Sequence, residues 1–338
     1  MQLLENFNLK AFNTFGINVS AKMFAAFTNN HELIEILSDT TILKEQRLVL
    51  GGGSNILFTK NFDGIVLKNN LKGIELVKHD NDFYYVKCAA GEVWHELVMH
   101  CITNNYAGLE NLSLIPGNVG ASPMQNIGAY GVEIKDTFYE LEAFHIKEKS
   151  IRKFNTEECK FGYRDSVFKR ELKNQYIITS VTFKLRKNPI FNTSYGAIET
   201  ELKSMDVNTL SIQAISQAVC NIRNSKLPNP KEIGNAGSFF KNPEIPKTTF
   251  EKLKTEFPNI VGYDLENGNV KCATGWLIEQ CGWRGKTFGD AGVYKLQALV
   301  LVNYGNAKGN EIFELSQKIM DSVKEKFGIE LEREVNII

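Results

Sequence analysis

The chain has 338 residues, which is long for one hydrophobic core and suits two or three packed domains. Apolar residues make up 43% and charged residues 23%, an ordinary balance for a globular protein. The chain has 39 basic residues (Lys and Arg) and 39 acidic residues (Asp and Glu), so its net charge is zero. This balance argues against a basic face that binds nucleic acid or an anionic membrane. It does not argue against a local pocket for a small phosphorylated ligand.

The opening of the chain predicts a small α/β unit. Asn29 followed by Glu32 is typical of a helix N-terminus, and apolar residues at helical spacing follow. A short strand is predicted at residues 47–50, directly before the sequence Gly-Gly-Gly-Ser-Asn. Further strands are predicted at 62–68 and 73–79.

The middle of the chain is rich in predicted strands. A strand at 84–89 is followed by a helix whose apolar residues recur at helical spacing from Trp94 to Ile102. Residues 177–185 alternate between apolar and mostly polar side chains. This alternation predicts a half-buried strand.

The last third mixes helices and strands. One helical face is predicted from Ile212 to Ile222, and Thr248 with Glu251 forms a capping box that predicts the start of a short helix. A long amphipathic helix should end at Gly328. Residues 329–338 then alternate as a closing strand, with the apolar side chains on one face and three glutamates on the other.

The cysteines carry no sign of a metal site. None of the six lies in a Cys-x-x-Cys pair, and the five histidines do not cluster near them. We interpret them as buried or incidental thiols in a reducing compartment. The N-terminus lacks the pattern of a signal peptide, and no stretch approaches the roughly 18 apolar residues of a membrane span. We therefore expect a cytoplasmic protein.

Two glycine-rich segments are the first candidates for a binding site. Gly51–Asn55 follows a predicted strand, and three glycines allow a sharp turn whose N–H groups can surround a diphosphate. The second segment, residues 115–131, is long and poor in bulky side chains, and such loops usually enclose a ligand. It is neither the G-x-G-x-x-G of a Rossmann domain nor a P-loop. Together the segments suit a long dinucleotide with its pyrophosphate between them, although the first alone could be a tight surface turn.

Three single residues are candidate catalytic residues, and each also has a simpler structural interpretation. Arg164 could present its planar guanidinium to a carboxylate, or it could form a surface salt bridge to Asp165 or another carboxylate. Ser238 could expose its hydroxyl in a pocket, or it could cap a turn. Glu334 by periodicity alone is one of three solvated glutamates on the polar face of a strand.

Taken together, the segments resemble UDP-N-acetylenolpyruvoylglucosamine reductases. The resemblance covers essentially the whole chain and is carried by NTFGI, GGGSNILF, GLENLSLIPGNVGASPMQNIGAYGVE, FGYRDSVFK, KLPNPK, GNAGSFFKNP and QALVLVN. The long middle motif and GNAGSFFKNP are specific, whereas the glycine triplet is shared by a wider FAD-binding superfamily.

The resemblance implies an α+β architecture with an FAD-binding fold of the vanillyl-alcohol-oxidase (PCMH) type. We predict a small α/β FAD-binding part at 1–70, a larger strand-rich FAD-binding part at 71–218, and an α/β substrate-binding domain at 219–338 whose last strand packs back at the flavin. Hydride would pass from NADPH to non-covalent FAD and then to the vinyl carbon of the enolpyruvyl ether, giving UDP-N-acetylmuramate for peptidoglycan synthesis. We further expect a monomer with no nucleic-acid partner, no membrane partner and no bound metal.

The resemblance also assigns roles to individual residues. Ser238 would deliver a proton to C2 of the substrate, while Arg164 and Glu334, the latter most useful when protonated, would steady the enolate-like intermediate. The predicted cofactor-binding residues are Gly51, Gly52, Gly53, Ser54, Asn55, Ile115, Gly117, Gly120, Ala121, Ser122, Gly128, Gly131 and Arg164. The predicted substrate-binding residues are Tyr130, Tyr195, Lys226, Asn242, Tyr263 and Gln297. The preference for NADPH over NADH rests on the resemblance alone.

One departure from the family pattern lies at the C-terminus. The family commonly ends with Glu-Pro-Glu-Val-Arg, whereas this chain has Glu-Arg-Glu-Val-Asn. Glu334 keeps its register, but Asn336 replaces the usual terminal arginine and with it any ligand contact that this arginine makes.

Two other functions remain open from the sequence. The first is another FAD-dependent oxidase or dehydrogenase of the same fold that acts on an alcohol or a sugar, although no histidine lies in the glycine-rich loops to tether a flavin. The second is a non-catalytic module that binds a UDP-sugar or flavin, which would have no need for the proton donor Ser238.

Overall fold

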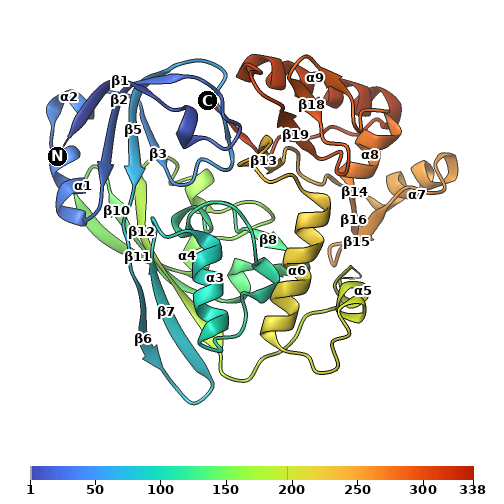
Figure 1. The fold of residues 1–338 in the computed structure, drawn as a ribbon, viewed down its shortest axis with the longest axis horizontal. Helices are drawn as coiled ribbons and strands as arrows, with labels where there is room; N and C mark the ends of the chain where they lie inside the picture. Colours follow the sequence, from blue (N-terminus) through green and yellow to red (C-terminus); the bar gives the residue numbers. More distant parts are fainter. Residues whose placement is uncertain (1, 196) are drawn as a thin grey trace. The chain divides into compact units, whose positions relative to one another are not determined.

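The computed structural model describes residues 2–195 and 197–338, which form two compact units (Figure 1). The first unit contains the N-terminal residues up to Phe7 together with Ala21–Gly52 and Asp63–Ser225. The second contains Asn8–Ser20, Gly53–Phe62 and Lys226–Ile338. Residue 70 lies inside the first unit, whose last residue is Ser225. The division into three parts stays a prediction.

The beginning of the chain forms the small α/β layer that was predicted. Four strands pair in the order β1-β2-β5-β3, and β3 and β5 run parallel. Apolar side chains from the two helices pack on β2 and β5 and form one core cluster. Asn29 caps α1 by accepting the N–H of Glu32, as predicted. The elements are β1 (Leu3–Asn8), β2 (Ser20–Phe27), α1 (Asn30–Ile36), α2 (Thr40–Leu43), β3 (Arg47–Leu50) and β5 (Phe62–Asn69).

A larger antiparallel sheet follows in the same unit. Its strands pair in the order β11-β10-β12-β7-β6. The predicted strands at 73–79, 84–89 and 177–185 are confirmed within one or two residues at their ends. The strands are β6 (Ile74–His79), β7 (Phe83–Ala89), β10 (Phe138–His145), β11 (Ser150–Asn155) and β12 (Tyr176–Arg186).

The prediction that residues 177–185 form a half-buried strand is wrong. From Ile177 to Phe183 every residue of β12 is buried, including Ser180 and Thr182. The reason is the central place of β12 in the sheet, because Ile177 contributes to the core cluster under α1 while Ile178 and Val181 contribute to the other cluster. The buried hydroxyls are satisfied locally, since Thr179 and Ser180 both donate to Glu142. Polar residues in a strand therefore did not mark a solvated face.

The helix α3 (Trp94–Thr103) packs against this sheet through the residues that its spacing predicted. Trp94, Leu97, Val98, Cys101 and Ile102 are all buried in one core cluster. The Trp94 ring meets Phe183 edge to face at 5.7 Å, and its indole N–H donates to the carbonyl of Leu112 at 2.8 Å.

We expect Trp94→Phe to lower the free energy of unfolding by about 1–3 kcal/mol, because it leaves the buried carbonyl of Leu112 without its donor. Trp94→Ala should cost about 3–5 kcal/mol, because it also opens a cavity. Urea denaturation followed by far-UV circular dichroism measures both effects. Met99→Ala on the exposed side of the same helix is the control and should change stability by less than about 0.5 kcal/mol. Equal stability of Trp94→Phe and the wild type would show that the hydrogen bond is not needed.

Short elements and two further helices complete the first unit. The helix predicted from Ile212 is confirmed as α6, and its apolar face packs with α5 in a third cluster. The side chain of Gln213 at the start of α6 donates to the carbonyl of Ile102 at the end of α3. The elements are β8 (Gly128–Ala129), β9 (Val132–Glu133), α4 (Thr156–Cys159), α5 (Ala197–Ser204) and α6 (Ile212–Lys226), with 3-10 helices η2 (Glu110–Leu112), η3 (Val119–Ala121), η4 (Ile134–Asp136) and η5 (Val167–Lys169).

The second unit is built on an antiparallel sheet with the order β13-β19-β18-β17 and a smaller sheet with the order β14-β16-β15. The predicted long helix is α9, which ends before Gly328, a residue with a left-handed φ of 67°. Its apolar face is buried through Ile312, Leu315, Ile319, Val323 and Phe327. The elements are η1 (Lys10–Phe12), β4 (Ile56–Leu57), β13 (Gly234–Ser238), β14 (Glu244–Pro246), α7 (Lys247–Glu256), β15 (Gly262–Asp264), β16 (Asn269–Cys272), α8 (Thr274–Gln280), β17 (Thr287–Phe288), β18 (Ala291–Val293), β19 (Val300–Asn303), α9 (Gly309–Phe327) and β20 (Asn336–Ile337).

Two predictions in this unit need correction. The capping box at Thr248 and Glu251 is wrong, because α7 begins at Lys247 after Pro246 and has no side-chain cap. The closing strand is regular only at Asn336–Ile337, although the predicted alternation holds, with Ile329, Leu331 and Val335 buried.

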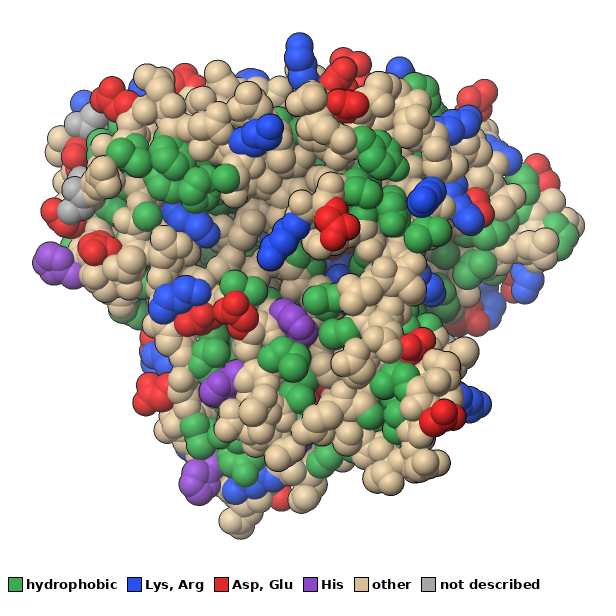
Figure 2. Space-filling model, viewed as in Figure 1, with side chains coloured by type: hydrophobic (Ala, Val, Ile, Leu, Met, Phe, Trp, Pro, Cys, Tyr) green, Lys and Arg blue, Asp and Glu red, His purple; other side chains and the backbone are tan. Residues whose placement is uncertain are grey.

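Charged side chains of both signs are interspersed over the face that Figure 2 shows, in keeping with the zero net charge. Within the described part of the chain, no helix combines the length and the apolar character needed to cross a bilayer.

Candidate active site

The turn after β3 is built from glycine because its backbone has no room for side chains. Gly53 has a φ of 63°, and a Cβ there would overlap the carbonyl oxygen of Phe12. The carbonyl of Gly53 accepts the N–H of Thr14 at 3.1 Å, so the turn is bonded to the NTFGI segment that carries part of the resemblance. The strand, the tight turn and the close approach of backbone agree with what the triplet predicted.

The second glycine-rich loop lies directly against this turn. A Cβ on Gly52 would lie 2.9 Å from Oδ1 of Asn118 and 3.0 Å from Cα of Gly117. A Cβ on Gly120 would lie 2.5 Å from the Cβ of Ala90. The two loops that the sequence singled out thus meet backbone to backbone, and larger residues would separate them.

The backbone donors of these loops fit a diphosphate. The N–H groups of Gly51, Gly52 and Gly117, which all belong to the first unit, have no acceptor among the residues that the structure describes. Successive N–H groups in a turn can form an anion-binding concavity. These loops could therefore hold a diphosphate through their backbone donors.

Lys68 belongs to the same locality, and sequence reasoning missed it. Its Nζ donates to the carbonyl of Gly51 at 2.7 Å, and burial, followed by the nearby Lys72, lowers its pKa. A lysine directly after the apolar run Ile65–Leu67 of strand β5 was the signal that could have identified it. Asn118 was also missed, although it lies inside the quoted motif and bonds to the carbonyl of Gly91 at 2.6 Å.

The rest of the second loop is held by internal bonds. The hydroxyl of Ser122 donates to the carbonyl of Val119 at 2.7 Å, so this predicted cofactor-binding residue supports the loop's own fold. Ala121 is exposed and Ile115 is half-buried. Gly128 begins the β8–β9 hairpin, and Gly131 forms its turn with a φ of 79°.

Arg164 is fixed against that hairpin. Its Nη2 donates to the carbonyl of Gly128 at 2.7 Å, and its guanidinium carbon lies 5.4 Å from the centre of the Tyr163 ring. Arg164 has a left-handed φ of 52°. Asp165, one of the carboxylates considered as a partner for Arg164, pairs with Arg170. The unusual backbone and the oriented guanidinium are typical of a functional residue.

Ser238 and Glu334 lie on adjoining segments of the second unit. Ser238 ends β13, is exposed, and its hydroxyl has no partner among the described residues. The next residue, Phe239, is buried, and its carbonyl accepts the N–H of Glu334 at 2.8 Å. The carbonyl of Glu334 in turn accepts the side-chain amide of Asn55 at 3.2 Å. The predicted proton donor, the predicted carboxyl residue and the glycine-rich turn are thereby linked.

The two residues that differ from the family pattern at the C-terminus, Arg333 and Asn336, both make contacts in the structure. Arg333 bonds to Ser316 and Gln317, both at 2.8 Å, and stacks on Phe313, so it anchors the closing segment to α9. Asn336 donates its side-chain amide to the carbonyl of Asn55 at 2.9 Å. Asn336 and its neighbour also pair with β4, which directly follows the glycine-rich turn. Asn336 thus contacts the turn itself.

The predicted substrate-binding residues fall into one group in each unit. In the first unit the rings of Tyr130 and Tyr195 meet edge to face at 5.6 Å. In the second unit Asn242 accepts the N–H of Thr274 at 3.0 Å, and Gln297 approaches the next residue, Gly275. Tyr263 and Lys226 are exposed, and Tyr263 lies on β15, which pairs with the strand before α8.

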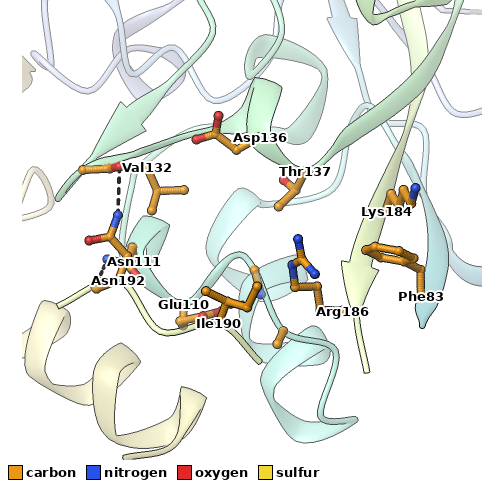
Figure 3. Close-up of a pocket in the computed structure, with 13 residues that line it drawn as sticks. Phe83, Glu110, Asn111, Val132, Asp136, Thr137, Lys184, Arg186, Ile190 and Asn192 are labelled. Carbon is orange, nitrogen blue, oxygen red and sulfur yellow. Dashed lines mark hydrogen bonds between the residues drawn. The ribbon is translucent and has the colours of Figure 1, made fainter. Parts of the chain in front are cut away.

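A separate pocket of about 410 Å³ lies in the first unit (Figure 3). In Figure 3 the guanidinium of Arg186 points into it, towards Thr137, from the end of β12. Asn111 and Asn192 tie one wall together, because Asn111 donates to the carbonyl of Asn192 at 2.9 Å and Asn192 donates to that of Gly131 at 3.1 Å. Gly131 is the one predicted cofactor-binding residue among the described residues that line it.

All six cysteines, each within the described residues, are unpaired, and four of them are buried. Burial raises the pKa of Cys101 and Cys159 to about 12 and that of Cys272 to about 11. Thiols with such pKa values are protonated at neutral pH and are poor nucleophiles. No group of three His, Cys, Asp or Glu side chains in the described part of the chain could hold a metal ion.

Two family models match the chain. The model described as "UDP-N-acetylenolpyruvoylglucosamine reductase, C-terminal domain" matches residues 229–338, and the model "FAD binding domain" matches residues 21–147. The second match spans both glycine-rich loops, and the first spans Ser238 and Glu334.

Similar proteins cover the chain from end to end. UDP-N-acetylenolpyruvoylglucosamine reductases from Flavobacterium johnsoniae and Amoebophilus asiaticus are 52% and 51% identical to it, over the full length of both chains in each case. The reductase from Pseudomonas savastanoi pv. phaseolicola is 46% identical over 100% of this chain and 99% of its own. A crystal structure of such a reductase from Thermus caldophilus has a TM-score of 0.69 at 23% identity, covering 99% of this chain and 98% of that one. The predicted α+β class with an FAD-binding fold is thereby confirmed.

Proposed function

Because the chain belongs to the family of UDP-N-acetylenolpyruvoylglucosamine reductases, we propose that it reduces the enolpyruvyl ether of UDP-N-acetylenolpyruvoylglucosamine with FAD and NADPH, giving UDP-N-acetylmuramate for peptidoglycan synthesis. The proposal rests on one combined observation. The specific motifs are present over the whole chain, and the two glycine-rich loops lie against each other with backbone N–H groups that have no acceptor among the described residues.

The cofactor would be held by the loops around Gly52 and Gly117. Their N–H groups have no acceptor among the described residues, so they are available to an anion, and Lys68 adds a nearby positive charge. FAD, when bound there, supplies the hydride that reaches the vinyl carbon of the substrate, and NADPH is the source of that hydride.

Arg164 and Glu334 would stabilise the charge that hydride addition creates. Addition to the vinyl carbon places negative charge on C2 and on the adjoining carboxylate. The guanidinium of Arg164 is oriented in advance by the carbonyl of Gly128, so it need not reorganise during the reaction. The backbone of Glu334 is bonded at both of its polar groups, because its N–H donates to the carbonyl of Phe239 and its carbonyl accepts from the side-chain amide of Asn55. These bonds fix the backbone position from which the carboxyl group of Glu334 acts.

Ser238 would deliver a proton to C2. A serine hydroxyl is too weak an acid for most bases, but a carbanion-like centre is basic enough to accept its proton. The exposed hydroxyl of Ser238 has no competing partner among the described residues, which suits a group that must donate to a ligand. The tyrosine pair Tyr130 and Tyr195, with Lys226, Asn242, Tyr263 and Gln297, would contact the UDP-sugar.

A cytoplasmic location and a monomeric state belong to the same proposal. The unpaired cysteines suit a reducing compartment, where thiols stay reduced. The oxidase alternative lacks support, since its characteristic tether is a histidine in the flavin loops and neither loop contains one.

The test is anaerobic stopped-flow spectroscopy of the purified yellow protein. We expect NADPH to bleach the flavin absorbance and the enolpyruvyl UDP-sugar to restore it. Glu334→Gln should slow the second step by roughly 100-fold or more and leave the first unchanged, since the carboxyl group acts on the substrate. Glu332→Gln is the matched control, because Glu332 is exposed and pairs with Lys241. Full-speed recovery in Glu334→Gln would exclude the assigned role, and recovery with oxygen alone would point to an oxidase.

A further inference from the structure

The second glycine-rich loop is preceded by a residue in a rare backbone conformation. Leu114, directly before Ile115, has a left-handed φ of 59°. For a residue other than glycine this conformation is disfavoured by about 5- to 30-fold in population, so it persists only where the surroundings hold it. Leu114 lies between η2 and the loop that meets Gly52, so its conformation decides the direction in which the loop leaves the core.

Two side chains hold Leu114 at its two backbone polar groups. Its N–H donates to Nδ1 of His95 at 2.9 Å, and its carbonyl accepts from Nε of Arg223 at 3.2 Å. His95 lies in the first turn of α3, and Arg223 lies near the end of α6. Both helices are docked through buried faces, so these groups approach Leu114 from rigid elements.

The protonation state of His95 suits this bond. Nδ1 can accept only when the imidazole is neutral with its proton on Nε2. Burial lowers the pKa of His95, and the neighbouring positive charge of Arg223 lowers it further, while Glu96 opposes this effect. Arg223 also lies close enough to the phenol of Tyr130 for the two groups to interact electrostatically, so it lies near both the start of the loop and its GAYG end.

The same helix holds the loop at a second point. The N–H of Trp94, beside His95, donates to the carbonyl of Gly117 at 2.9 Å, and Val93 forms a bridge with Asn118. The segment from Leu114 to Asn118 is thus pinned at both ends by the first turn of α3. The part between the pins includes the glycine that abuts Gly52.

We propose that His95 and Arg223 are positioning residues that hold Leu114 in its left-handed conformation and thereby place the Ile115–Gly120 loop for FAD. The inference rests on the proposed function, because it takes this loop as the cofactor site. It does not require either side chain to touch the flavin. It predicts that FAD binding no longer depends on His95 when residue 114 is one that adopts a positive φ without support from a side chain.

The experiment measures FAD affinity by titrating the apoprotein and following flavin fluorescence. His95→Leu should weaken FAD binding about 10-fold, and Arg223→Met should do the same. His95→Asn should stay within about threefold of the wild type, because its side-chain oxygen can accept the Leu114 N–H. The double variant His95→Leu with Leu114→Gly should regain most of the lost affinity, because glycine adopts a positive φ at no steric cost. His100→Leu, on the same helix, is the control and should bind FAD normally.

The outcomes separate the possible failures. If the wild-type apoprotein takes up no FAD, the proposed function fails. If the wild type binds FAD and His95→Leu binds it equally well, or if Leu114→Gly gives no recovery, the positioning role is overturned. If His95→Leu does not fold, the FAD affinities of Leu114→Ile and Leu114→Gly are compared instead. A β-branched residue resists a positive φ, so Leu114→Ile should bind FAD about 10-fold more weakly than Leu114→Gly, and equal affinities would overturn the proposal.

Discussion

Replacing Ser238 by alanine should slow reduction of the enolpyruvyl substrate by roughly 100- to 10,000-fold, the range over which a positioned general acid usually acts. The loss should appear in kcat rather than in KM, because the hydroxyl is needed only when charge develops on C2. Flavin reduction by NADPH should continue at its normal rate, since no proton reaches the substrate in that step. Rapid-mixing measurements of the two half-reactions separate these effects.

The serine variant should fold normally, which makes the result interpretable. Ser238 is exposed, and its hydroxyl bonds to no described residue, so its removal should change the free energy of unfolding by less than about 0.5 kcal/mol. A variant that retains its melting temperature and also retains at least half of the wild-type kcat would remove Ser238 from the mechanism.

Replacing Gly53 by alanine should both destabilise the protein and release its flavin. The positive φ costs an alanine about 1–2 kcal/mol, and the overlap of its Cβ with the carbonyl of Phe12 adds about 1–3 kcal/mol of strain. The turn must therefore shift, and its N–H groups lose their alignment towards the diphosphate. We expect FAD affinity to fall more than 10-fold. Thermal melts of the apoprotein and flavin titration measure the two effects separately.

The matched control is Gly268→Ala. Gly268 has a φ of 82°, but no atom lies within 4 Å of the position that its Cβ would take. It forms the turn between β15 and β16. This variant should lose only the cost of the positive φ, about 1–2 kcal/mol, and should keep its FAD affinity. Equal flavin loss in both variants would mean that the effect reports general instability rather than the geometry of the first glycine-rich turn.

Local elements could be predicted well where a single physical signal dominated. The helices from Trp94, Ile212 and Ile312 follow from apolar spacing, because a helix buries one stripe of side chains. The strand β12 was harder. Its serine and threonine residues gave the pattern of a solvated face, yet Thr179 and Ser180 donate to Glu142 on β10, and sequence alternation contains no information about such partners.

Some residues of the site could likewise be predicted from the sequence, and others could not. The glycine triplet and the long loop were identified because their composition has few uses other than close backbone approach. Lys68, His95 and Arg223 were missed because each acts through a carbonyl or N–H of a residue far along the chain. A lone polar side chain on an apolar element gives the same sequence signal whether it serves a loop or merely reaches solvent.

The amino-acid sequence by itself determined the family, the class of fold and the reaction, because long specific motifs of glycines, aromatics and charged residues survive in it from residue 13 onward. Only the tertiary structure decided how the glycine-rich loops meet, which N–H groups they leave available, and how Asn55 comes to bond to Glu334. The physical reason is that these are contacts between segments up to hundreds of residues apart. Hydrophobic spacing constrains each segment separately, whereas the meeting of segments depends on packing.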